Sequence, residues 1–228
     1  MKLTAEQRIE RAHVRLMQSP EFCLFSGVFM VGKVEVSDTC HTAKTNGRDV
    51  IYGREFVESL NDKQLAFLVV HEAMHKAYRH LTVWKHLKEK RIANYAMDYV
   101  INLQIKDADP YEKEVAMPRD NQTGKIIGLL DEKYRGMDTK QVYDILMQEI
   151  QSGGGSGGDD ESDGGEGQPQ GGNGHSSQGG GQNDDASDGL DEHDWDGATE
   201  MTQEEKEELG REIDSALREG SMLAGKMK

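Results

Sequence analysis

Apolar and polar positions alternate along the first 150 residues in patterns that predict mostly helices. The apolar run LAFLVV lies in a long helix that Asn61 and Gln64 open as a capping pair. Asp138 and Gln141 repeat that pair at the start of a later helix, and Thr4 can cap the first one. Helices are therefore expected over residues 4–18, 60–87, 92–105 and 138–150.

Strand signals fall between the first two of these helices. Residues 22–36 are rich in β-branched and aromatic side chains, and the short run Asp49–Tyr52 follows the turn signal Asn46-Gly47. A few short strands among longer helices predict an α+β fold with a small sheet.

The pattern changes abruptly after residue 150. Residues 153–181 contain 14 of the 26 glycines of the chain and almost no apolar side chains. Such a segment buries too little surface to offset the entropy lost on ordering, so it is expected to be disordered. Thr202 and Glu205 then form a capping box that opens a final helix. The predicted organisation is a folded domain over 1–150, an acidic glycine-rich linker over 151–198 and a helical segment over 199–228.

Charge follows the same division. The first 150 residues carry 22 basic and 22 acidic side chains, whereas residues 151–228 carry 5 and 20, which accounts for the net charge of −15. An acidic tail repels phosphate backbones and anionic membrane surfaces, so neither nucleic acid nor a membrane is an expected partner. It favours solubility or docking of a basic protein partner.

Compartment is indicated by what the sequence leaves out. The N-terminus has no signal-peptide core, and the apolar run Phe22–Gly32 is shorter than the roughly 20 residues of a membrane helix. Cys23 and Cys40 are too few for a disulfide framework, so both are expected to be reduced thiols. These features together predict a cytoplasmic protein.

The candidate chemistry lies in the stretch VHEAMHKAYRH, which contains the motif His-Glu-x-x-His. On a helix, His71 and His75 stand one turn apart, and Glu72 lies about 100° from His71. This arrangement lets two imidazoles bind one zinc ion while the carboxylate acts as general base toward a metal-activated water. The competing interpretation is a solvated helix face that happens to carry histidines.

A catalytic zinc usually has a third protein ligand. If the helix continues, His80 points about 180° away from His71, and His86 lies about 22 Å along the axis, so neither is suitable. Asp98 is the better candidate, because the next helix can return antiparallel and place it opposite the two histidines. Asn94 and Asn102 lie on the same stripe as Asp98 and could orient a ligand.

Three stretches together resemble the bacterial and phage metallopeptidase domain that precedes a von Willebrand factor A-like domain in longer proteins. They are TAKTNGRDVIYGREFVESLNDKQLAFLVVHEAMHKAYRH, NYAMDYVIN and LLDEKYRGMDTKQVYDIL, covering about residues 40–150, and DEHDW with the closing helix (191–227) is also similar. The von Willebrand-like domain is not part of these 228 residues. The resemblance implies a zincin-like fold, zinc ligands His71, His75 and Asp98, and the catalytic residue Glu72. It also implies an edge strand for extended peptide, expected near Asp49–Tyr52.

The expected function is therefore a zinc-dependent metallopeptidase that acts on a peptide or protein substrate. A different class is also open: a metal-stabilised binding module that cleaves nothing and uses its acidic tail for interaction. Tyr95 and Tyr99 are weaker candidates for stabilising a developing oxyanion, since tyrosines on an amphipathic helix commonly belong to the core. His175 and His193 are expected to lie in a solvated tail.

Overall fold

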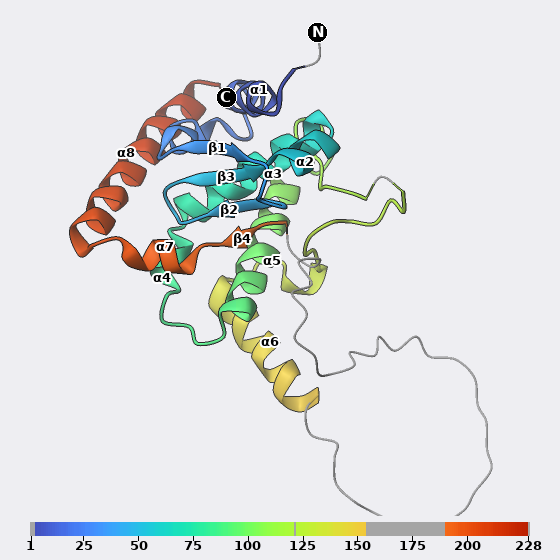
Figure 1. The fold of residues 1–228 in the computed structure, drawn as a ribbon, viewed down its shortest axis with the longest axis vertical. Coiled ribbons are helices and arrows are strands. Elements are labelled where there is room, and N and C mark those ends of the chain that lie inside the picture. Colours follow the sequence, from blue (N-terminus) through green and yellow to red (C-terminus); the bar gives the residue numbers. More distant parts are fainter. Residues whose placement is uncertain (1–2, 121, 154–189, 228) are drawn as a thin grey trace, which may run out of the picture.

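The computed structural model describes residues 3–120, 122–153 and 190–227, which form a small sheet packed against helices (Figure 1). The sheet has four strands in the order β1-β3-β2-β4. Their bounds are Val34–Ser37 (β1), Ala43–Thr45 (β2), Val50–Gly53 (β3) and Glu192–His193 (β4). β3 pairs in parallel with β1 and antiparallel with β2, and β4 adds in parallel to the other side of β2. The predicted α+β class is confirmed.

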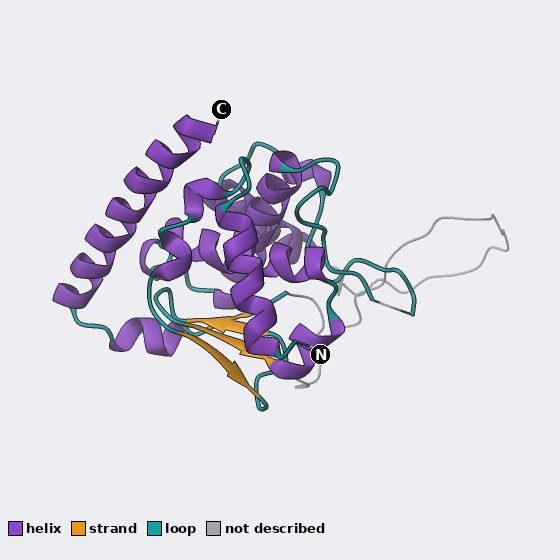
Figure 2. Cartoon of the chain, turned by 90° about the horizontal axis from the view of Figure 1, so that it is seen from above, coloured by secondary structure: helices purple, strands orange, loops and turns teal. Residues whose placement is uncertain are grey.

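The two faces of the sheet differ in burial. Val50, Tyr52 and Thr45 are buried on the inner face, and the register places His193 beside Thr45 there. Successive residues of a strand point to opposite faces, so the charged and half-buried positions of the same strands face outward. Figure 2 shows the sheet at one side of the molecule with the helices gathered over its inner face.

The helices follow the predicted order. They are α1 (Ala5–Met17), α2 (Arg54–Ser59), α3 (Asp62–Ala77), α4 (His80–Val83), α5 (Lys90–Ala108), α6 (Thr139–Gly153), α7 (Trp195–Glu200) and α8 (Gln203–Met227). Short 3₁₀ helices lie at Cys23–Phe25 (η1), Val28–Met30 (η2) and Glu132–Tyr134 (η3). The predicted capping pairs at Thr4 and Asn61 are both formed.

Helix α3 lies at the centre of the molecule. Every residue from Gln64 to Lys76 is buried, so the helix is enclosed on all sides and is not amphipathic. α1 packs on one side of it and α5 on another. The LAFLVV run therefore fixes α3 in the core, and its C-terminal half carries the histidines into the interior.

The structure departs from the expected strands at 22–36, because only Val34–Ser37 is a strand. Residues 23–30 form η1 and η2, and their apolar side chains pack into the core from irregular turns. Apolar and aromatic content predicted a buried segment correctly but could not separate a strand from 3₁₀ turns. The prediction of an edge strand near Asp49–Tyr52 is also wrong. These residues form β3, which is hydrogen-bonded to a strand on each side and therefore offers no free edge to a peptide.

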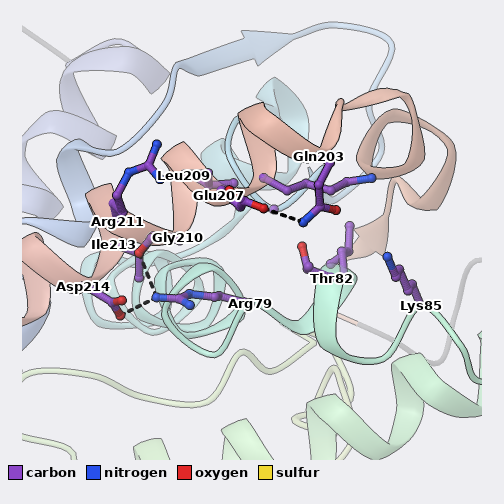
Figure 3. Close-up of a pocket in the computed structure, with 13 residues that line it drawn as sticks. Arg79, Thr82, Lys85, Gln203, Glu207, Leu209, Gly210, Arg211, Ile213 and Asp214 are labelled. Atoms are coloured by element: carbon purple, nitrogen blue, oxygen red, sulfur yellow. Dashed lines mark hydrogen bonds and ion pairs between the residues drawn. The ribbon is translucent and has the colours of Figure 1, made fainter.

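The long helix predicted over 60–87 is interrupted at Arg79, which has a left-handed backbone with φ of 52°. The Arg79 guanidinium donates to the carbonyl oxygen of Gly210 at 2.7 Å and pairs with Asp214, both on α8 (Figure 3). A tertiary contact made 131 residues away thus holds a break that local sequence does not signal.

The C-terminal residues join the same core as α3. Leu190, Leu209 and Ile213 are buried within it, and α8 packs along η1. Of the linker predicted over 151–198, residues 154–189 lie outside the described residues. Residues 190–198, however, contain β4 and most of α7. In the described part of the chain, no helix has the length and apolar character needed to cross a membrane.

Candidate metal centre

Helix α3 brings two imidazoles together in the interior. His71 and His75 are both fully buried, and their Nε2 atoms lie 3.1 Å apart. Their one-turn spacing puts both rings on the same side of the helix. Two ring nitrogens this close, each able to offer a lone pair, are arranged to share one cation.

Helix α5 supplies a carboxylate to the same point. α5 packs on α3 through Ile101 and Ile105, which are buried in the same core as the apolar residues of α3, whereas Ala93 and Ala96 are buried in the cluster that α5 shares with α6. An Asp98 oxygen lies 3.4 Å from Nε2 of His75 and 3.8 Å from Nε2 of His71. The structure thus brings together the three residues that the sequence predicted as metal ligands.

A fourth group, Asp191, comes from the residue just before β4. Its side chain is buried, and Oδ1 lies 3.3 Å from Nε2 of His71. Ligand atoms of His71, His75, Asp98 and Asp191 all lie within 4.8 Å of one another. Ligands about 2.0–2.1 Å from a tetrahedral zinc are separated by roughly 3.4 Å. The separations of 3.1–3.8 Å between the four pairs named above are close to that value.

The rings are oriented by partners on the side away from the cluster. Asn102 donates through Nδ2 to the carbonyl oxygen of Leu129 at 2.8 Å, so its Oδ1 faces His71 as an acceptor. Nδ1 of His71 lies 2.8 Å from that oxygen and must therefore donate to it. His71 is left with an unprotonated Nε2 toward the cluster, which is the tautomer a metal needs.

His75 is oriented by two further histidines. Its Nδ1 lies 2.8 Å from Nε2 of His193 and 3.1 Å from Nδ1 of His80. Burial, and then the neighbouring His193 and His71, hold the pKa of His75 well below its ordinary value. A neutral imidazole that donates through Nδ1 presents Nε2 to the cluster, as at His71.

Glu72 lies beside this cluster and is buried. Among the described residues, neither of its carboxyl oxygens meets a hydrogen-bond partner. Burial raises the pKa of Glu72 well above its ordinary value, and the negative charge of Asp191 raises it further. A buried carboxyl group without a hydrogen-bond partner is costly unless a cation or a proton compensates it.

The charges of the centre suit a divalent cation. Burial and the charge of Asp191 raise the pKa of Asp98 well above its usual range. Lys76 is the nearby buried cation, and burial lowers its pKa to about 8. If Glu72, Asp98 and Asp191 are ionised beside a protonated Lys76, the formal charge is −2. Two neutral imidazoles and two carboxylates are ligands typical of zinc.

Several histidines lie elsewhere than the sequence suggested. His80 was expected to point away from His71, but it is buried against His75 because the helix breaks before it. His193 was expected in a solvated tail, yet it is buried beside the same ring. His86, which was expected to lie too far along the helix to be a ligand, is exposed.

The two tyrosines considered for an oxyanion role make contacts away from the centre. The hydroxyl of Tyr95 accepts a hydrogen bond from Arg91 at 2.7 Å. The ring of Tyr99 packs on Tyr134 with 4.6 Å between centroids. Tyr52 is the tyrosine whose pKa responds to the centre: burial raises it well above its ordinary value, and Glu72 and Asp191 add to the effect.

A groove of about 450 Å³ lies between α4 and α8, away from the metal centre. Figure 3 shows Thr82 and Lys85 on one wall and Gln203 and Glu207 on the other. The groove contains none of the clustered histidines. We therefore place the candidate chemistry at the buried centre.

Comparison with known families extends over nearly the whole chain. Residues 4–228 match the sequence model of a family described as "Putative metallopeptidase domain". No curated protein and no solved structure matches the chain. The matched range includes the C-terminal residues that carry Asp191 and His193 as well as the His-Glu-x-x-His helix.

Proposed function

The chain belongs to this metallopeptidase domain family, and from that premise we propose that it is a zinc-dependent peptidase. The observation that carries the proposal is the convergence of the Nε2 atoms of His71 and His75 on Asp98, beside the buried Glu72. These three residues would hold the zinc ion, and Glu72 would be the general base.

A zinc ion bound there supplies a Lewis acid that polarises a carbonyl group and lowers the pKa of water. The chain's own residues do the rest. Glu72 accepts the proton of the attacking water and passes it to the leaving amine. Burial and the charge of Asp191 raise the pKa of Glu72, which makes its carboxylate a stronger base than an exposed one.

Substrate binding is proposed along β2. An extended peptide can add to a sheet through main-chain hydrogen bonds, and in the described part of the chain the side of β2 away from β3 is covered by just the two residues of β4. This arrangement supports a zincin-like site, with the sheet edge assigned to β2 and not to β3.

Two substitutions test the chemistry. Glu72→Gln should bind zinc stoichiometrically and lose at least about 100-fold in the rate of cleavage of an unstructured protein such as casein, because the general base is gone. His71→Ala should lose both zinc and activity. Zinc content by atomic absorption and cleavage by a fluorescent peptide-release assay are the measurements.

Glu58→Gln is the matched control, since Glu58 is an exposed carboxylate. It should behave like the wild type in both assays. Wild-type protein without stoichiometric zinc, or undiminished cleavage by Glu72→Gln, would refute the proposal.

The second candidate function is a metal-stabilised module that binds a partner without cleaving it. The position of Asp191 favours it, because four protein ligands are typical of structural zinc sites. Zinc-loaded wild type without cleavage across a broad peptide library would support this function over the first.

A further inference from the structure

The segment Leu190–Trp195 crosses the candidate metal centre and is fastened on both sides of it. On the sheet side, β4 pairs with Lys44 and Thr45 of β2, and the amide of Asp194 donates to the Thr45 carbonyl oxygen at 2.8 Å. On the helix side, Nε1 of Trp195 donates to Asn94 of α5 at 3.0 Å.

The start of the segment is equally fixed. Leu190 is fully buried and lies directly over Gly128, where a Cβ would approach its side chain to 2.7 Å. Between these anchors, Asp191 points inward to His71, and His193 reaches His75. The segment therefore contributes two side chains to the centre from residues that lie 120 and 118 positions away along the chain.

The position of Asp191 is informative. One of its oxygens lies 3.3 Å from His71, and the other has no hydrogen-bond partner among the described residues although it is buried. That second oxygen lies 3.6 Å from Nε2 of His193. A buried carboxylate oxygen without a hydrogen bond, beside three other ligand atoms, points to a cation. A catalytic zinc site leaves one such position to water, and here a protein side chain lies in it.

On the basis of the proposed function, we infer that Asp191 is a fourth protein ligand of the metal and that its segment blocks the active site. The same residues that deliver the carboxylate also occupy the edge of β2, where a substrate peptide would pair. Cleavage then requires Asp191 to leave the metal and β4 to leave β2. The blocking group is this chain's own Leu190–Trp195 segment.

Metal binding in the full-length protein provides the test. Zinc affinity is measured by competition with a chromophoric chelator, and coordination is followed through the visible spectrum of the Co²⁺-loaded protein. Asp191→Ala should weaken zinc binding at least about tenfold, since even partners outside the ligand shell contribute 10–100-fold. The Co²⁺ spectrum of this variant should differ from that of the wild type, and added acetate should restore the wild-type spectrum.

Cleavage per bound zinc should rise in Asp191→Ala relative to the wild type, because the blocking ligand is gone. Glu192→Gln is the matched control: Glu192 is the exposed neighbour on β4 and should leave affinity and spectrum unchanged. Asp191→Asn keeps the volume of the side chain and carries the same measurements if the alanine variant does not fold.

Two results would overturn the inference and leave the proposed function standing. Unchanged zinc affinity and an unchanged Co²⁺ spectrum in Asp191→Ala, with binding abolished in His71→Ala, would exclude Asp191 as a ligand. Weakened zinc binding without a gain in cleavage would exclude the blocking role. Absence of metal in the wild type would instead refute the proposed function itself.

Discussion

His71 can offer Nε2 to a metal only if its proton resides on Nδ1, and Asn102 fixes that choice. The amide is itself held by the carbonyl oxygen of Leu129, so it can present only its oxygen to the ring. Both His71 and Asn102 are completely buried. Asn102 is therefore a positioning residue for the metal centre.

Asn102→Ala should weaken zinc binding about 10–100-fold, because the imidazole loses its tautomeric constraint. Chelator competition measures the change, and circular dichroism establishes that the fold is retained. Gln104→Ala serves as control on the same helix, since Gln104 is exposed and bonds only the Tyr78 hydroxyl among the described contacts. Equal zinc affinity in both variants would contradict the role of Asn102.

The candidate ligands that could be predicted from the sequence are those on one helix or on two consecutive helices. His71, Glu72 and His75 follow from helical spacing, and Asp98 follows from an antiparallel return of the next helix. Asp191 and His193 could not be found this way, because 118–120 residues separate them from their partners. A weak signal exists, since Leu190 and Trp195 are apolar residues at the end of a very polar stretch.

Helix α8 is the element that most changes the predicted organisation. It packs against η1, and Gly220 lies where the two backbones meet. A Cβ at Gly220 would come within 1.9 Å of the Leu24 carbonyl oxygen. Glycine is required at this position because no larger residue fits.

Gly220→Ala should destabilise the protein by about 1–3 kcal/mol, because η1 or α8 must shift to make room. Gly225 lies on the same helix, and a Cβ added there would meet no atom of the described residues within 4 Å. Gly225→Ala should therefore be neutral or stabilising by up to about 1 kcal/mol. Urea unfolding of both variants measures the difference. Equal midpoints would show that the contact with Leu24 does not constrain α8.

Local signals predicted the elements unevenly. Helix starts were predictable because capping pairs are local, as at Asn61 and Asp138. The end of α3 was not, because the Arg79 break is held by α8. The segment at 23–30 shows the other failure, since its apolar residues are compatible with any buried conformation.

The whole molecule is assembled from both ends of the sequence around α3. Leu190, Leu209 and Ile213 from the C-terminal part are buried in the same core as α1 and α3. Burying three such side chains contributes about 4–9 kcal/mol. This is comparable with the total stability of about 5–15 kcal/mol typical of a folded domain.

A chain ending at residue 153 should therefore lose cooperative unfolding or unfold at a much lower temperature. Differential scanning calorimetry measures this directly. A chain lacking only residues 223–228 is the control, because Leu223 and residues 225–227 at the end of α8 are exposed. An unchanged unfolding transition in the chain ending at residue 153 would mean that residues 1–153 fold independently, as the sequence alone predicts.

Strand β4 has a consequence for the protein in its open form. It is only two residues long, yet it covers the outer edge of β2. Uncovered sheet edges invite pairing with any available chain. Opening the site to a peptide would thus also expose the unpaired backbone groups along the edge of β2. Molecules that opened without a substrate would tend to associate with one another, so a short cover that returns readily protects the protein against aggregation.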